Sequence, residues 1–72
     1  MRQYFDKNGK KVKEGMTLRH EDGTLEKVYK AKDGDLGLNA SNESYSGFNP
    51  LKRELYPLYQ FDMKEWEIVD EQ

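Results

Sequence analysis

Three Asx-Gly dipeptides, Asn8-Gly9, Asp22-Gly23 and Asp33-Gly34, divide the first half of this 72-residue chain into short segments. In each pair the first residue tolerates a positive φ and the glycine adopts one without strain, so the pair favours a tight hairpin turn. The intervals between the turns suit antiparallel strands of a few residues and are too short for long amphipathic helices. The chain is therefore predicted to be mostly β.

The segments around these turns show the alternation of a half-buried strand. In residues 16–19, Met16 and Leu18 should face inward. Residues 24–31 form the next expected strand, where strict alternation cannot bury both Leu25 and Val28. We expect a β-bulge at residues 26–27 that brings these two side chains to one face.

After the third turn, the sequence predicts a strand, a long loop, one helical turn and an edge strand. Residues 36–40 form the third expected strand, in which Gly37 permits close approach of another backbone. Residues 39–49 are rich in Asn and Ser and form a long loop. One helical turn is expected at residues 50–55, and Pro57 makes residues 56–61 an edge strand.

The C-terminal segment carries signals for a short helical turn and a last strand. Asp62 is placed to cap the turn, with Glu65 as the reciprocal residue of a capping box and Phe61 and Trp66 as a hydrophobic staple. From Trp66 onward, alternation predicts the final strand. The whole chain, residues 1–72, is thus predicted to be one SH3-like barrel of about five short antiparallel strands with one or two helical turns; an OB-like barrel and a bent meander are the alternatives.

The run DKNGKKVKEGM at residues 6–16 resembles the opening D-x-N-G-K-x-[IV]-x-E-G-D of small phage proteins of the YopX-like kind, and WEIV at residues 66–69 is similar to a strand near their end. The resemblance implies a β-rich protein of phages or mobile elements of Gram-positive bacteria, with no assigned activity. Met16 replaces the family's acidic residue, and the sequence stops at Gln72 where the family continues. Residues 39–43 and 56–58 look instead like other small uncharacterised proteins of such elements.

The composition of the chain excludes several classes of site and of binding partner. The formal charge is −2 with 12 Lys and Arg against 14 Asp and Glu, so no global field attracts nucleic acid or anionic lipid. There is no cysteine, which excludes disulfides and thiolate sites, and no apolar run long enough for a leader or a membrane span. We expect a cytoplasmic, non-enzymatic protein that uses no cofactor or metal and does not enter a membrane.

The only histidine, His20, is the one candidate general base. It belongs to the expected turn with Glu21 and Asp22, which predicts a solvent-exposed side chain. A catalytic role would require His20 in a cleft with paired carboxylates.

Two surfaces are candidates for binding. The loop at residues 39–49 carries large rings among hydrogen-bonding side chains and is predicted to contact a protein partner through Asn39, Asn42, Tyr45 and Phe48; the alternative is that the rings cover one end of the barrel. The N-terminal turn carries Lys7, Lys10, Lys11 and Lys13 beside aromatic residues, which supports nucleic-acid binding as the alternative function. Arg19, Lys27 and Lys30 extend this patch across the first hairpin if the strand register places them there.

Overall fold

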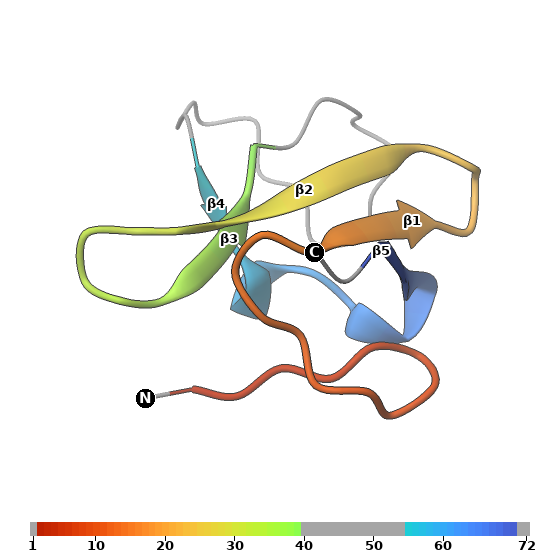
Figure 1. Ribbon diagram of the computed structural model, residues 1–72, viewed down its shortest axis with the longest axis horizontal. Helices are drawn as coiled ribbons and strands as arrows, with labels where there is room; N and C mark the ends of the chain where they lie inside the picture. The colour runs from red at the N-terminus through yellow and green to blue at the C-terminus, as the bar shows by residue number, and fades with distance from the viewer. Residues whose placement is uncertain (1, 40–54, 71–72) are drawn as a thin grey trace.

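The computed structural model describes residues 2–39 and 55–70, and five strands lie within them. The strands are β1 (Thr17–His20), β2 (Leu25–Lys30), β3 (Leu36–Leu38), β4 (Tyr56–Pro57) and β5 (Trp66–Asp70). Two single-turn 3-10 helices, η1 (Leu58–Gln60) and η2 (Met63–Glu65), connect β4 to β5. All pairings are antiparallel, and the strand order is β4-β3-β2-β1-β5 (Figure 1).

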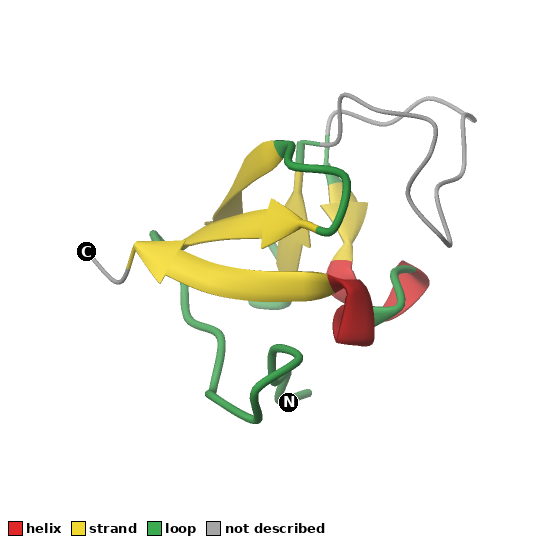
Figure 2. Cartoon of the chain, turned by 90° about the vertical axis from the view of Figure 1, so that its right-hand side faces the viewer, coloured by secondary structure: helices red, strands yellow, loops and turns green. Residues whose placement is uncertain are grey.

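Strand β2 is shared by two pairings and gives the sheet its curvature. Its first half, from Leu25 to Lys27, pairs with β1, and its second half, from Val28 to Lys30, pairs with β3. The strands therefore wrap around a common interior, with the two 3-10 turns on one side (Figure 2). This arrangement, with a helical turn before the last strand, confirms the predicted mostly β, SH3-like barrel.

The core is built from the inward-facing side chains of every strand and of the segments before β1 and after β4. Its fully buried members are Val12, Leu18, Val28, Leu38, Leu58 and Trp66. Burial of each of the aliphatic ones contributes roughly 1.5–3 kcal/mol of transfer free energy. Met16 and Leu18 face inward as the alternation predicted.

The predicted bulge in the second strand is wrong. Strand β2 alternates without interruption: Leu25 is 58% exposed, whereas Glu26 and Val28 are buried. The turn before β2 fixes a register in which Leu18 of β1 lies opposite Glu26, so placing Val28 in the core also turns Glu26 inward and Leu25 outward. The sheet's irregularity lies instead between β1 and β5, at residues 17–18.

The N-terminal segment, residues 2–16, covers the outer edge of β5. The Lys7 N–H donates to the carbonyl oxygen of Trp66 at 2.8 Å. The Ile68 N–H donates to Oδ2 of the buried Asp6 carboxylate at 3.0 Å. These bonds occupy backbone groups that an open sheet edge would offer to another chain.

Asp6 also organises the predicted turn at Asn8-Gly9. Its Oδ1 accepts hydrogen bonds from the backbone N–H groups of Asn8 and Lys10, at 2.9 and 2.8 Å. Burial alone would raise the pKa of Asp6, but the N–H groups of Ile68, Lys10 and Asn8 outweigh burial and hold this pKa below its ordinary value. A charged carboxylate therefore fastens the N-terminal turn to the barrel.

The C-terminal turn forms largely as predicted. Asp62 caps η2 by accepting from the Lys64 N–H at 3.1 Å. The rings of Phe61 and Trp66 meet edge to face, with centroids 6.1 Å apart, as the predicted staple requires. Glu65, expected to close the capping box, directs its Oε1 to His20.

The prediction of a strand over residues 56–61 is wrong beyond its first two residues, because η1 follows β4 directly. Pro57 does lie on an edge strand, as predicted, since β4 ends the strand order. Gly37 allows the close approach expected of it: a Cβ atom there would lie 2.6 Å from the carbonyl oxygen of Tyr56.

Two predicted elements lie outside the described residues: the loop at residues 39–49, except for Asn39, and the helical turn at residues 50–55, except for Leu55. Among the described residues, no helix has the length and apolar character needed to cross a membrane.

Candidate functional site

Residues 2–39 and 55–70 line two hollows that differ in charge: the first is mainly cationic, and the second mixes cations with carboxylates. The first, which we call the basic hollow, has a volume of about 270 Å³ and lies between the N-terminal segment, the end of β2 and the start of β3. Its lining consists of Arg2, Gln3, Lys11, Val12, Lys13, Glu14, Lys30, Gly34 and Leu36. The lining thus contains four cationic residues and one acidic residue, although the formal charge of the whole chain is −2.

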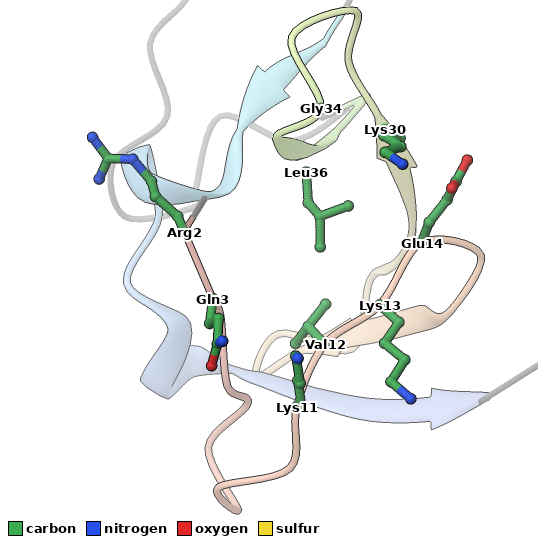
Figure 3. Close-up of a pocket in the computed structure, with 9 residues that line it drawn as sticks. All are labelled: Arg2, Gln3, Lys11, Val12, Lys13, Glu14, Lys30, Gly34 and Leu36. Atoms are coloured by element: carbon green, nitrogen blue, oxygen red, sulfur yellow. The ribbon is translucent and has the colours of Figure 1, made fainter.

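The floor of the basic hollow is apolar. Val12 is buried, and Leu36 packs against the core while remaining partly exposed. Figure 3 shows both side chains pointing into the space that the cationic residues surround. A ligand here would meet hydrocarbon below and positive charge at the rim.

Two of the four predicted lysines, Lys11 and Lys13, line this hollow. Lys11 and Lys13 are exposed on either side of the buried Val12, and both line the hollow. Of the three cations predicted to extend the patch, Lys30 joins them from the end of β2, whereas Arg19 and Lys27 are not part of the lining.

Arg2 is held at the rim by two neighbours. Its guanidinium carbon lies 4.5 Å from the centroid of the Tyr59 ring, and its Nε lies 3.9 Å from Oδ2 of Asp35. Oδ1 of Asp35 accepts from the Tyr4 hydroxyl at 2.8 Å. Burial and this hydrogen bond raise the pKa of Tyr4, so its hydroxyl remains a neutral donor.

The structure separates the other two predicted lysines from this site. Lys10 lies at the exposed N-terminal turn. Lys7 lines the second hollow. The predicted four-lysine cluster is therefore divided, and Arg2 and Lys30 complete the basic site in place of Lys7 and Lys10.

The second hollow, which we call the imidazole hollow, has a volume of about 360 Å³ and surrounds the only histidine. Its lining consists of Lys7, Arg19, His20, Glu21, Gly23, Glu65 and Glu67. Arg19 and Glu67 form an ion pair across β1 and β5, with Nη2 2.8 Å from Oε1.

The prediction that His20 is solvent-exposed is wrong, because its side chain is only 5% exposed. His20 is the last residue of β1, and alternation with Leu18 turns it inward. Its ring meets Trp66 edge to face at a centroid distance of 4.9 Å. Nε2 lies 2.7 Å from Oε1 of Glu65, and Nδ1 lies 3.2 Å from Oδ1 of Asp22.

These partners set the charge of the ring. Burial alone would lower the pKa of His20, but the hydrogen bonds to Glu65 and Asp22 and their negative charges outweigh burial and raise this pKa above its ordinary value. These contacts stabilise the protonated ring relative to a free imidazole, and the Asp22 backbone N–H also lies 3.3 Å from Nδ1.

Glu21 is the remaining carboxylate beside the histidine. Its backbone N–H donates to the carbonyl oxygen of Glu65 at 3.0 Å, which ties the β1–β2 turn to the end of η2. Ligand atoms of His20, Glu21 and Glu65 lie within 4.8 Å of one another. The sequence places Glu65 45 residues from His20, so no local motif reveals this grouping; only the pairing of β1 with β5 does.

The predicted loop site is described only at its first residue. Asn39 is exposed directly after β3, at the opposite end of that strand from Leu36. Asn42, Tyr45 and Phe48 lie outside the described residues.

Comparison of the chain with protein-family models, curated proteins and solved structures yields no match. The YopX-like resemblance stays a prediction.

Proposed function

We propose that this protein is a non-enzymatic protein-interaction module of a phage or mobile element, acting in the cytoplasm, and that its basic hollow receives an acidic segment of a protein partner. The observation that supports this most is the gathering of Arg2, Lys11, Lys13 and Lys30 around an apolar floor.

The chemistry of the hollow selects its occupant by charge and shape. Exposed lysines attract a carboxylate-rich segment, while the floor of Val12 and Leu36 suits one apolar side chain of the same segment. Exposed ion pairs contribute little each, typically below about 1 kcal/mol. The apolar anchor would therefore supply affinity, and the charges would supply orientation and selectivity.

The loop at residues 39–49 is proposed as a second contact surface, through Asn39, Asn42, Tyr45 and Phe48. Asn39, the one described residue of this surface, is exposed directly after β3.

The non-enzymatic assignment rests on how His20 is used. Both of its ring nitrogens lie within 3.2 Å of a carboxylate oxygen, and its ring packs on Trp66. A general base needs a free ring nitrogen directed at a reacting proton. His20 does lie in a hollow beside two carboxylates, but both of them contact its ring nitrogens and raise its pKa, which supports a structural role for the ring.

The proposal is tested with an acidic peptide of Glu residues flanking one Leu, titrated into the isotope-labelled protein and followed by NMR. We expect shifts centred on the amides of Val12, Lys13 and Leu36 that weaken as salt is added. The double variant Lys11→Ala/Lys13→Ala should weaken binding by at least about fivefold, since each charge-assisted contact is worth several tenths of a kcal/mol or more. Lys64→Ala, an exposed lysine on η2, is the matched control and should bind as the wild type does.

A peptide in which Lys replaces Glu should not bind. Equal binding of the Lys-rich and Glu-rich peptides, or shifts confined to residues outside the hollow, would contradict the proposal.

Single-stranded nucleic acid is the second candidate ligand, and one observation favours it. Exposed aromatic rings lie beside cations of the basic hollow. Arg2 lies over the ring of Tyr59, which is 52% exposed. Phe5, which is 47% exposed, forms an antiparallel backbone β-bridge with Lys11. Rings next to cations can stack on bases while the charges contact phosphates.

A fluorescent oligothymidylate titrated at two salt concentrations tests this function. Binding should weaken steeply with salt and should be lost in Phe5→Ala/Tyr59→Ala, whereas the acidic peptide should still bind that variant. An unchanged oligonucleotide affinity in the variant would reject the stacking role of these rings.

A further inference from the structure

We propose that His20, Glu21 and Glu65 form a binding site for a divalent transition cation of the Zn²⁺ class. The site is separate from the basic hollow, and the proposed function does not depend on it.

The donor set matches such a cation. One imidazole nitrogen and two carboxylates, all within 4.8 Å of one another, come from β1, the β1–β2 turn and η2. Imidazole suits Zn²⁺, Cu²⁺ and related ions, whereas Mg²⁺ and Ca²⁺ prefer sites made of oxygen alone. The His20 side chain is 5% exposed, so the nitrogen donor is held in place by the core.

The surroundings of the histidine are those of a metal ligand. Nδ1 faces Oδ1 of Asp22 at 3.2 Å, and metal-binding histidines usually donate their second N–H to a carboxylate in this way. That contact leaves Nε2 directed toward Glu65 and the hollow. A cation there would displace the proton shared by Nε2 and Glu65 into solvent.

The imidazole hollow provides access and room. Its volume of about 360 Å³ lets water complete the coordination of a cation held by three protein ligands. Ligand atoms of a tetrahedral Zn²⁺ centre lie about 3.3 Å apart, given bonds of about 2.0–2.1 Å. Closing the site therefore requires the exposed Glu21 to swing inward, while the backbone bond from Glu21 to Glu65 keeps the two carboxylates adjacent.

The test uses the untagged full chain and ZnCl₂ in isothermal titration calorimetry, with MgCl₂ as the comparison ion. We expect saturable one-to-one binding of Zn²⁺ and no comparable binding of Mg²⁺. Because the chain has a single histidine, its imidazole proton resonances report the same titration without ambiguity and should shift with Zn²⁺.

Two matched variants locate the site. Glu21→Gln removes an exposed ligand and should weaken Zn²⁺ binding at least about tenfold. Glu67→Gln changes a carboxylate that lines the same hollow but lies outside the ligand set, and its affinity should stay within about twofold of the wild type.

Absence of saturable Zn²⁺ binding, equal binding of Mg²⁺, or an unchanged affinity in Glu21→Gln would each overturn the proposal. Thermal unfolding of both variants without metal provides the folding control, because neither substitution removes a buried group.

Discussion

The two hollows differ in what their charged groups do for the fold. Around the basic hollow, Lys11, Lys13 and Lys30 are exposed and surround a floor that the core supplies. In the imidazole hollow, His20 is itself buried and joins three elements through Glu65, Asp22 and Trp66. Removal of the cations should leave the shape of the basic hollow intact, whereas removal of His20 should disturb the structure around the imidazole hollow.

This difference separates two uses of polar side chains in a small barrel. Exposed cations contribute little to stability because water screens them. A buried, hydrogen-bonded ion pair is costly to break, since removal of one partner leaves the other charge in a poorly solvated position. Substitutions that change ligand binding at the basic hollow should therefore cost little stability. Substitutions of His20 or its partners at the imidazole hollow should also destabilise the fold.

The largest expected effect is the loss of the histidine. His20→Ala should lower the free energy of unfolding by about 3 kcal/mol, because it removes the contact between the imidazole and the Glu65 carboxylate and creates a cavity against Trp66. Urea unfolding followed by Trp66 fluorescence measures this change. Arg19→Ala, on the same strand but exposed, is the control and should cost less than about 1 kcal/mol; similar losses in the two variants would place His20 among ordinary surface residues.

A smaller effect is expected from pH. The pKa of His20 is raised in the folded state, so its contribution to stability is fully present below the ordinary value of about 6.5 and is lost as pH rises through the folded value. The pKa of Asp6 is lowered, so its contribution is present above the ordinary value of about 3.9 and is lost as pH falls through the folded value. The free energy of unfolding should therefore decline on both sides of a mildly acidic plateau.

Urea unfolding across the pH range tests this profile. His20→Gln should flatten the alkaline decline and leave the acid decline, and Asp6→Asn should do the reverse. An alkaline decline that persists in His20→Gln would assign it to another group.

The smallest effect is expected at the basic hollow. Lys11→Ala/Lys13→Ala should change the free energy of unfolding by no more than about 0.5 kcal/mol, because both side chains are exposed and the floor is retained. The same urea measurement checks it. A loss comparable to that of His20→Ala would show that the two hollows do not differ in the way described.

Much of the fold could be predicted because its signals are local. A turn needs only an Asx-Gly pair, inward residues of β1 and β5 follow from alternation, and the cap of η2 needs only Asp62 two residues before Lys64. The register of β2 could not be predicted in this way. The pattern around Leu25 and Val28 predicted a bulge that brings both inward, whereas the pairing with β1 buries Glu26 and leaves Leu25 exposed.

The sites were predicted less completely, since each joins residues that are distant in the chain. Lys11 and Lys13 were identified by sequence, but Arg2 and Lys30 reached them only through the packing of the N-terminal segment against β2 and β3. The burial of His20 follows from alternation along β1, but its contact with Glu65, 45 residues away, could not be predicted from adjacency in sequence.

The sequence by itself determined the turns, the inward residues of β1 and β5 and the SH3-like, mostly β architecture, because these depend on backbone preferences and on the period of neighbouring side chains. Only the tertiary structure decided which cations share a surface and that the single histidine contacts the carboxylates of Glu65 and Asp22. Burial and electrostatic environment depend on contacts between β1, β5 and η2, and such contacts exist only once the chain has folded.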